Sequence, residues 1–210
     1  MSFITERNVM ATIGRPREFD RGAALKAAMV LFWRKGFAAT SMNDLCEAMG
    51  VRSPSLYAAF GSKEALYLEA IQHYVEMFGP PVWDGLAEGA TARAGVEKLL
   101  LAATESLPES HGTPGGCMAA LAAVSDEWPA GIAEVVVKIR MIMLGRLRSR
   151  LEAGAANGEL PTTTDIDALS RFYFSVYQGM AVQARDGADA AELKGLVAAA
   201  MAAWPSSGPG

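Results

Sequence analysis

The chain contains 210 residues, of which 51% are hydrophobic and 20% are charged. These proportions are typical of a globular protein with one or two domains and exclude a largely disordered chain. No apolar run reaches the ~18–20 residues that a membrane-spanning helix needs. The first ten residues lack the basic start and apolar core of a signal peptide. We therefore expect a cytoplasmic protein without a membrane partner.

The net charge of −4 is distributed unevenly along the sequence. Residues 1–63 contain nine Lys and Arg against five Asp and Glu, which gives +4, whereas residues 64–210 carry −8. A basic end joined to an acidic body indicates that the N-terminal part contacts a polyanion, while the body has a different task.

Helical patterns dominate the sequence, because alternating β-branched residues are scarce and Ala is abundant. We predict an all-α fold. Its first helix is expected at about residues 20–35, where Leu25, Ala28, Met29 and Phe32 form an apolar stripe at helical spacing.

The stretch after this first helix has the pattern of a helix-turn-helix. Ser41 is predicted to cap a short second helix, which ends at Gly50. In the third helix Ser53 is the predicted cap and Pro54 the first helical residue, where the missing N–H of proline costs nothing. Two ordinary helices of a bundle would show the same pattern, so this pattern alone leaves DNA binding as one of two interpretations.

The remainder of the chain continues the helical pattern. A fourth helix is predicted at residues 63–78, ended by the sequence Gly79-Pro80-Pro81. Further helices are expected at about residues 82–88, 93–107, 117–126, 129–156, 165–185 and 189–203.

Few residues are suited to catalysis or metal binding. Cys46, Cys117, His73 and His111 are the only cysteines and histidines, and they lie far apart in the sequence without metal-ligand spacing. We see no nucleophile–base pair. We therefore expect no catalytic residues, no metal and no cofactor. Cys117 begins a predicted helix, where a thiol can become reactive, and a sensing role stays open beside plain burial.

Residues 19–67 resemble the DNA-binding domain of TetR-type (TetR/AcrR family) transcriptional regulators. The resemblance is carried almost without gaps by LFWRKGFAATSMNDLCEAMGV, then SPSLYAAF, then GSKEALY. One departure is that Tyr57 is followed by Ala58, where many members have a second aromatic residue and a His before the Phe. The resemblance implies an all-α homodimer in which three N-terminal helices bind double-stranded DNA and a larger C-terminal helical domain holds a small effector.

The expected domain organisation follows from this resemblance. It consists of a flexible basic arm (1–18), a helix-turn-helix domain (19–65), an effector-binding and dimerisation domain (66–204) and a disordered tail (205–210).

The predicted DNA contacts lie at helix N-termini, which attract phosphate, and at the start of the third helix. Arg52 is the first candidate for reading a base, because Arg bonds guanine through two atoms, and Ser55 is the second. Tyr57 is a phosphate contact or a packing residue. The full predicted set is Arg15, Arg17, Thr40, Ser41, Arg52, Ser53, Ser55, Tyr57 and Lys63, with the two arm arginines directed to a minor groove.

Two further sets are predicted in the large domain. The adaptable, Met-rich residues expected to line an effector pocket are Met77, Phe78, Trp83, Leu100, Met118, Met141, Phe174 and Tyr177. The residues expected at the dimer interface are Ile139, Met143, Ala168, Ser175, Gly179 and Val182. Plain core packing is the alternative for both sets.

The predicted function is a ligand-responsive transcriptional repressor that binds a pseudo-palindromic operator as a dimer and is released by a small, mostly apolar effector. The alternative is a constitutive or thiol-responsive DNA-binding regulator without a small-molecule ligand.

Overall fold

A computed structural model describes residues 20–110, 112–122 and 128–205. Within these ranges the all-α prediction is confirmed, and the β-type contact is an isolated bridge between Ser110 and Thr113. The helices are α1 (Arg21–Lys35), α2 (Met42–Met49), α3 (Ser53–Phe60), α4 (Lys63–Trp83), α5 (Gly85–Glu88), α6 (Ala92–Ser106), α7 (Met118–Leu121), α8 (Ala130–Ala156), α9 (Ile166–Arg185) and α10 (Ala190–Ala202). None of the helices described here is long and apolar enough to cross a membrane. The predicted basic arm, with Arg15 and Arg17, lies outside the described residues, as does the predicted tail beyond Pro205.

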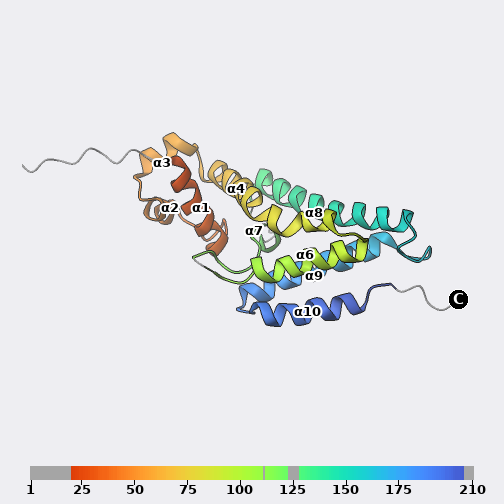
Figure 1. The fold of residues 1–210 in the computed structure, drawn as a ribbon. Helices are drawn as coiled ribbons and strands as arrows, with labels where there is room; N and C mark the ends of the chain where they lie inside the picture. The colour runs from red at the N-terminus through yellow and green to blue at the C-terminus, as the bar shows by residue number, and fades with distance from the viewer. Residues whose placement is uncertain (1–19, 111, 123–127, 206–210) are drawn as a thin grey trace, which may run out of the picture.

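The three N-terminal helices gather at one end of the molecule, and the long helices of the body extend away from them (Figure 1). The two parts are joined by α4, which packs against α1 at one end and against α6 and α8 in the body. Within the body α8 packs on α9, and α10 packs on α6 and α9. A structural change in the body can therefore reach the N-terminal helices through α4 or through direct contacts with α1.

Each helix of the N-terminal part buries one apolar side, and these buried residues are continuous with the core of the body. Phe32 of α1, Leu45 of α2 and Leu56 of α3 are each no more than 1% exposed. Phe32 also meets the ring of Tyr67 on α4 edge-on, with centroids 5.0 Å apart. Full burial of one such side chain stabilises the fold by roughly 1.5–3 kcal/mol, so these contacts fix the positions of α2 and α3.

The fourth helix differs from its prediction. It continues through Pro80 and Pro81 to Trp83, whereas the prolines were expected to end it near Phe78. Interior prolines remove helical hydrogen bonds and are costly. The helix persists because Trp83 is 2% exposed and its carbonyl accepts a hydrogen bond of 2.9 Å from Arg146 of α8. Tertiary packing of this last turn therefore outweighs the local signal.

Candidate functional site

The N-terminal end of α3 is fully open to solvent. Arg52 is the N-cap residue, with extended backbone angles and no side-chain capping bond, and Pro54 occupies the second helical position. This corrects the predicted cap, Ser53, by one residue. The proline remains harmless, because the first four N–H groups of a helix have no partner within the helix.

The exposed side of α3 carries the predicted contact residues. Arg52, Ser53 and Ser55 are exposed, and the side chain of Tyr57 is 48% exposed. The opposite side is held by Leu56 and by Phe60, which is 4% exposed. The structure thus leaves four of the predicted DNA-binding residues exposed at and near the N-terminal end of α3.

Arg21 of α1 fixes α3 in place, and sequence reasoning missed it. Its guanidinium lies 4.4 Å from the ring centroid of Phe60 and donates to the carbonyl of Ala59 over 3.4 Å. It also forms an ion pair of 2.7 Å with Glu69 of α4. One side chain therefore links α1, α3 and α4, although all these partners are at least 38 positions away in the sequence.

The start of α2 is closed by a reciprocal capping box. The Ser41 hydroxyl accepts from the Asp44 N–H over 3.1 Å, and the Asp44 carboxylate accepts from the Ser41 N–H over 2.9 Å. Lys35 of α1 adds an ion pair to Asp44 at 3.0 Å. The Ser41 backbone bond, with the Lys35 and Ser41 side chains, lowers the pKa of Asp44 from 3.8 to about 2.

Thr40 is removed from the predicted set of side-chain contacts to DNA. Its side chain is 1% exposed, and its hydroxyl donates to the carbonyl of Gly36 over 2.6 Å. The residue closes the turn between α1 and α2.

Lys63 is half-buried at the start of α4, with its ammonium 4.3 Å from the ring centroid of Phe37, and desolvation lowers its pKa.

We expect Asp44→Asn to reduce the free energy of unfolding near neutral pH, and the difference from the wild type to shrink in acid. Since the pKa of Asp44 is lowered from 3.8 to about 2 on folding, its contribution is fully present above 3.8 and is lost as the pH falls towards 2. Urea unfolding of both proteins at about pH 6 and about pH 3, followed by circular dichroism, measures this. A difference of equal size at both pH values would contradict the capping role.

The predicted effector-pocket residues do not line a common cavity, which corrects that prediction. Met77 is 41% exposed and Met141 is 55% exposed, whereas Leu100 is fully buried in the core. The remaining members are dispersed. Met118 lines a cavity beside α1, and Met141 and Phe174 line a groove between α8 and α9. Trp83 lines a hollow beside α8 and packs edge-on against Tyr177. Phe78 packs against Trp33 and Tyr74.

The predicted dimer residues of α9 and those of α8 differ in how exposed they are. On α9, Ala168, Ser175 and Val182 are exposed and Gly179 is half-buried, all on one side of the helix. On α8, Met143 is 7% exposed and packs within the protomer. Ile139 is half-buried against the core and lines the hollow beside α4. For these two residues the burial favours the alternative, plain core packing, and α8 has a second apolar stripe that is exposed.

We call this second stripe together with the exposed side of α9 the α8–α9 face. Its apolar members on α8 are Val137, 44% exposed, and Met141, and on α9 they are Phe172, 41% exposed, and Val182, 50% exposed. Exposed apolar side chains that gather on two neighbouring helices mark a contact surface.

Cys117 is the N-cap of α7 and is 1% exposed. Its sulfur accepts from the N–H of Ala120 over 3.4 Å, and the phenols of Tyr74 and Tyr177 lie close to the thiol. Burial comes first among the causes that raise the pKa of both phenols, and proximity to Cys117 adds to it. The thiol is thus enclosed within a group of polar partners.

Arg185, at the end of α9, is a further residue that sequence reasoning missed. Its guanidinium donates to the carbonyl of Trp33 over 2.6 Å, across 152 positions of the chain. A basic residue at a helix C-terminus is common, so no local signal distinguishes it. Only the folded chain shows that it connects the body to α1.

The short α2, the turn at Gly50 and the exposed α3 form a helix-turn-helix, and comparisons with known proteins assign this arrangement to regulators of transcription. Residues 24–70 match the bacterial regulatory proteins of the tetR family, and residues 95–201 match the C-terminal domain of tetracyclin repressor-like proteins. The HTH-type transcriptional repressor ComR of Escherichia coli (strain K12) is 35% identical over 196 residues, which cover 91% of this chain and 92% of ComR. The repressor BdcR of the same organism is 37% identical over 105 residues, or 50% of this chain and 53% of BdcR.

A solved structure with DNA is also similar. A cysteine mutant of the TetR family transcriptional regulator CifR, complexed with a 26-base-pair double-strand operator DNA, has a TM-score of 0.84 and 39% identity, covering 91% of this chain and 100% of CifR. The chain therefore belongs to the TetR family. It is a DNA-binding transcriptional repressor of that family.

Proposed function

We propose that the protein represses transcription by binding a pseudo-palindromic operator as a homodimer, and that a small effector bound in the helical body releases it. The observation that carries the DNA-binding part is the open N-terminal end of α3, at or near which Arg52, Ser53, Ser55 and Tyr57 are all exposed. A recognition helix enters the major groove by this end.

The roles of the four residues follow from their chemistry. Arg52 can bond O6 and N7 of guanine together, and Ser55 suits several bases. Tyr57 is one helical turn along and reaches a phosphate, which positions the helix without reading sequence. Lys63 and the N–H groups at the starts of α2 and α4 supply further phosphate contacts.

The homodimer is supported by the α8–α9 face. A two-fold axis through this face would bury its apolar members against their symmetry copies in a four-helix arrangement. Two recognition helices related by that axis need two inverted half-sites, about one helical turn of DNA or ~34–36 Å apart.

Selection of bound duplexes from a random pool tests the proposal. We expect the enriched sequences to contain an inverted repeat, because the symmetry of the protein is imposed on the DNA. Binding of the enriched duplex should exceed binding of a shuffled duplex of equal composition by about a thousandfold or more at physiological salt. Enrichment of a single unrepeated site, or of no site, would contradict binding as a symmetric dimer.

The thiol-responsive alternative receives less support from the geometry. Cys117 is 1% exposed and is held as the cap of α7. A buried structural cysteine is inert towards reagents in solution. We therefore propose release by a non-covalent ligand.

A further inference from the structure

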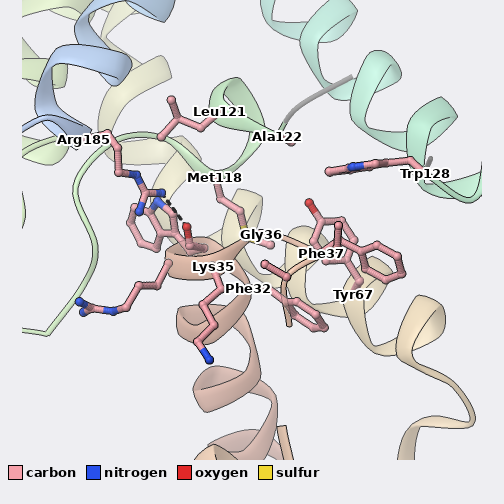
Figure 2. A pocket seen from close by; sticks show the side chains of 14 residues that line it. Phe32, Lys35, Gly36, Phe37, Tyr67, Met118, Leu121, Ala122, Trp128 and Arg185 are labelled. Atoms are coloured by element: carbon pink, nitrogen blue, oxygen red, sulfur yellow. Dashed lines mark hydrogen bonds between the residues drawn. The ribbon is translucent and has the colours of Figure 1, made fainter. Parts of the chain in front are cut away.

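A cavity lies at the junction between the C-terminal end of α1 and the body (Figure 2). Its volume is about 400 Å³, within the range of ~300–1,000 Å³ that is usual for small-molecule sites. It is lined from α1 and the following turn, from α4, from α7, from Trp128 just before α8, and from the end of α9. Any ligand here touches both the DNA-binding part and the body.

One side of the cavity is aromatic. The ring centroids of Phe37, Tyr67 and Trp128 lie 5.3 Å, 5.7 Å and 6.1 Å apart in the three pairs that they form. Figure 2 shows these rings on one side of Met118 and Arg185 on the other. A wall of three contacting rings suits a flat, apolar group, which can stack on it or meet it edge-on.

The other side is cationic, with Arg34, Lys35 and Arg185 in the lining, and among the described residues Arg185 is the one of the three without an ion pair. Arg185 bonds to a carbonyl oxygen, that of Trp33. The acidic residue whose charge acts on Arg185, Glu109, forms its own ion pair with Arg34 at 3.6 Å. Trp33 also lines the cavity, and its indole N–H is buried without a hydrogen-bond partner. Both features call for an acceptor, since unpaired buried donors are costly.

The electrostatics of Arg185 point in the same direction. Desolvation, followed by repulsion from Arg34, lowers the pKa of Arg185. Its surroundings therefore disfavour the positive charge. An anion placed next to the guanidinium would reverse this penalty.

Building on the effector-controlled function proposed above, we infer that this junction cavity is the effector site and that its ligand is a compact aromatic carboxylate. The carboxylate pairs with Arg185 and the ring system packs against Phe37, Tyr67 and Trp128.

The same contacts explain how such a ligand would release DNA. Arg185 connects the end of α9 to the carbonyl of Trp33 in the last turns of α1. A bound carboxylate competes for that guanidinium and loosens the connection. Since α1 packs against both α2 and α4, its displacement shifts the helix-turn-helix relative to the body. By linkage, operator DNA must weaken ligand binding by the same factor.

The test uses benzoate, 2-naphthoate and indole-3-acetate, each beside its neutral amide, in calorimetric titrations of the full-length protein without DNA. We expect the dissociation constant of at least one carboxylate to be lower than that of its amide by about tenfold or more. A charge-assisted hydrogen bond contributes a difference of this size. Arg185→Gln, which keeps a donor for the Trp33 carbonyl, should abolish this preference and leave the affinity for the amide unchanged. Lys194→Gln removes an equal charge from an exposed ion pair with Glu105 on the body and should change neither affinity.

A second variant addresses the cavity itself. Leu121→Phe adds volume from α7 inside the lining and should weaken the carboxylate and its amide alike. The carboxylate that binds should also lower the affinity for the selected operator. If no carboxylate binds below about 1 mM, or if Arg185→Gln retains the preference, the proposed site is overturned even though operator binding stands. If the wild type binds no operator, the repressor proposal fails, and the titrations without DNA still decide the cavity.

Discussion

Gly179→Glu should convert the protein to a monomer and abolish operator binding. Gly179 is half-buried on the α8–α9 face, and a Cβ atom placed there meets nothing within 4 Å in the protomer. A glutamate side chain would therefore project away from the protomer, towards the partner in the proposed dimer. Burying that charge costs several kcal/mol for each ion, and a two-fold interface buries two, so the dissociation constant of the dimer should rise at least about a hundredfold.

A matched substitution is available on α10. Gly195 is exposed, is also helical, and has nothing within 4 Å of its Cβ position. Gly195→Glu adds the same charge and the same helix propensity outside the α8–α9 face, and it should leave a dimer. Light scattering at micromolar concentration gives the mass of each protein. A monomeric wild type, or a dimeric Gly179→Glu protein, would show that the interface lies elsewhere.

The helix-turn-helix was predictable because its signals are local. Ser41 and Asp44 are three positions apart and form the capping box that their spacing indicates. Gly50 takes a left-handed conformation with φ of 65°, which the turn requires. The order of apolar residues in α2 and α3 specifies which side is buried, and the exposed side follows from it.

The body was less predictable, because long-range packing decides there. Two apolar stripes run along α8, one through Met143 and one through Met141, and the sequence does not say which faces the core of the protomer. The prolines of α4 were expected to end a helix that the burial of Trp83 sustains. Arg185 acquires its role from a partner 152 positions away, a separation that no local pattern encodes.

The contrast between local signals and long-range packing explains why the sequence predicted the candidate DNA-binding surface better than the effector pocket. A recognition helix presents consecutive residues, so its contact surface can be derived from one short segment. The junction cavity draws on five segments between Phe32 and Arg185. Met118 was the one member of the predicted pocket that lines it.

Arg52→Ala should weaken binding to the selected operator and relax the base preference at one position in each half-site. One bidentate Arg–guanine contact is worth roughly 1–3 kcal/mol, so losing it in both protomers costs about 2–6 kcal/mol, or roughly 30-fold to more than a thousandfold in affinity. Arg52 has no side-chain capping bond, so its removal should not unfold α3. Anisotropy titrations against the operator and its single-base variants measure both effects.

Lys98→Ala, which removes an exposed charge on α6, should bind as the wild type does. Lys63→Ala should instead weaken all duplexes equally and reduce the salt dependence by about one unit for each lost phosphate contact. If Arg52→Ala behaves like Lys63→Ala, with equal losses on every sequence, then Arg52 contacts a phosphate and the bases are read by other residues of α3.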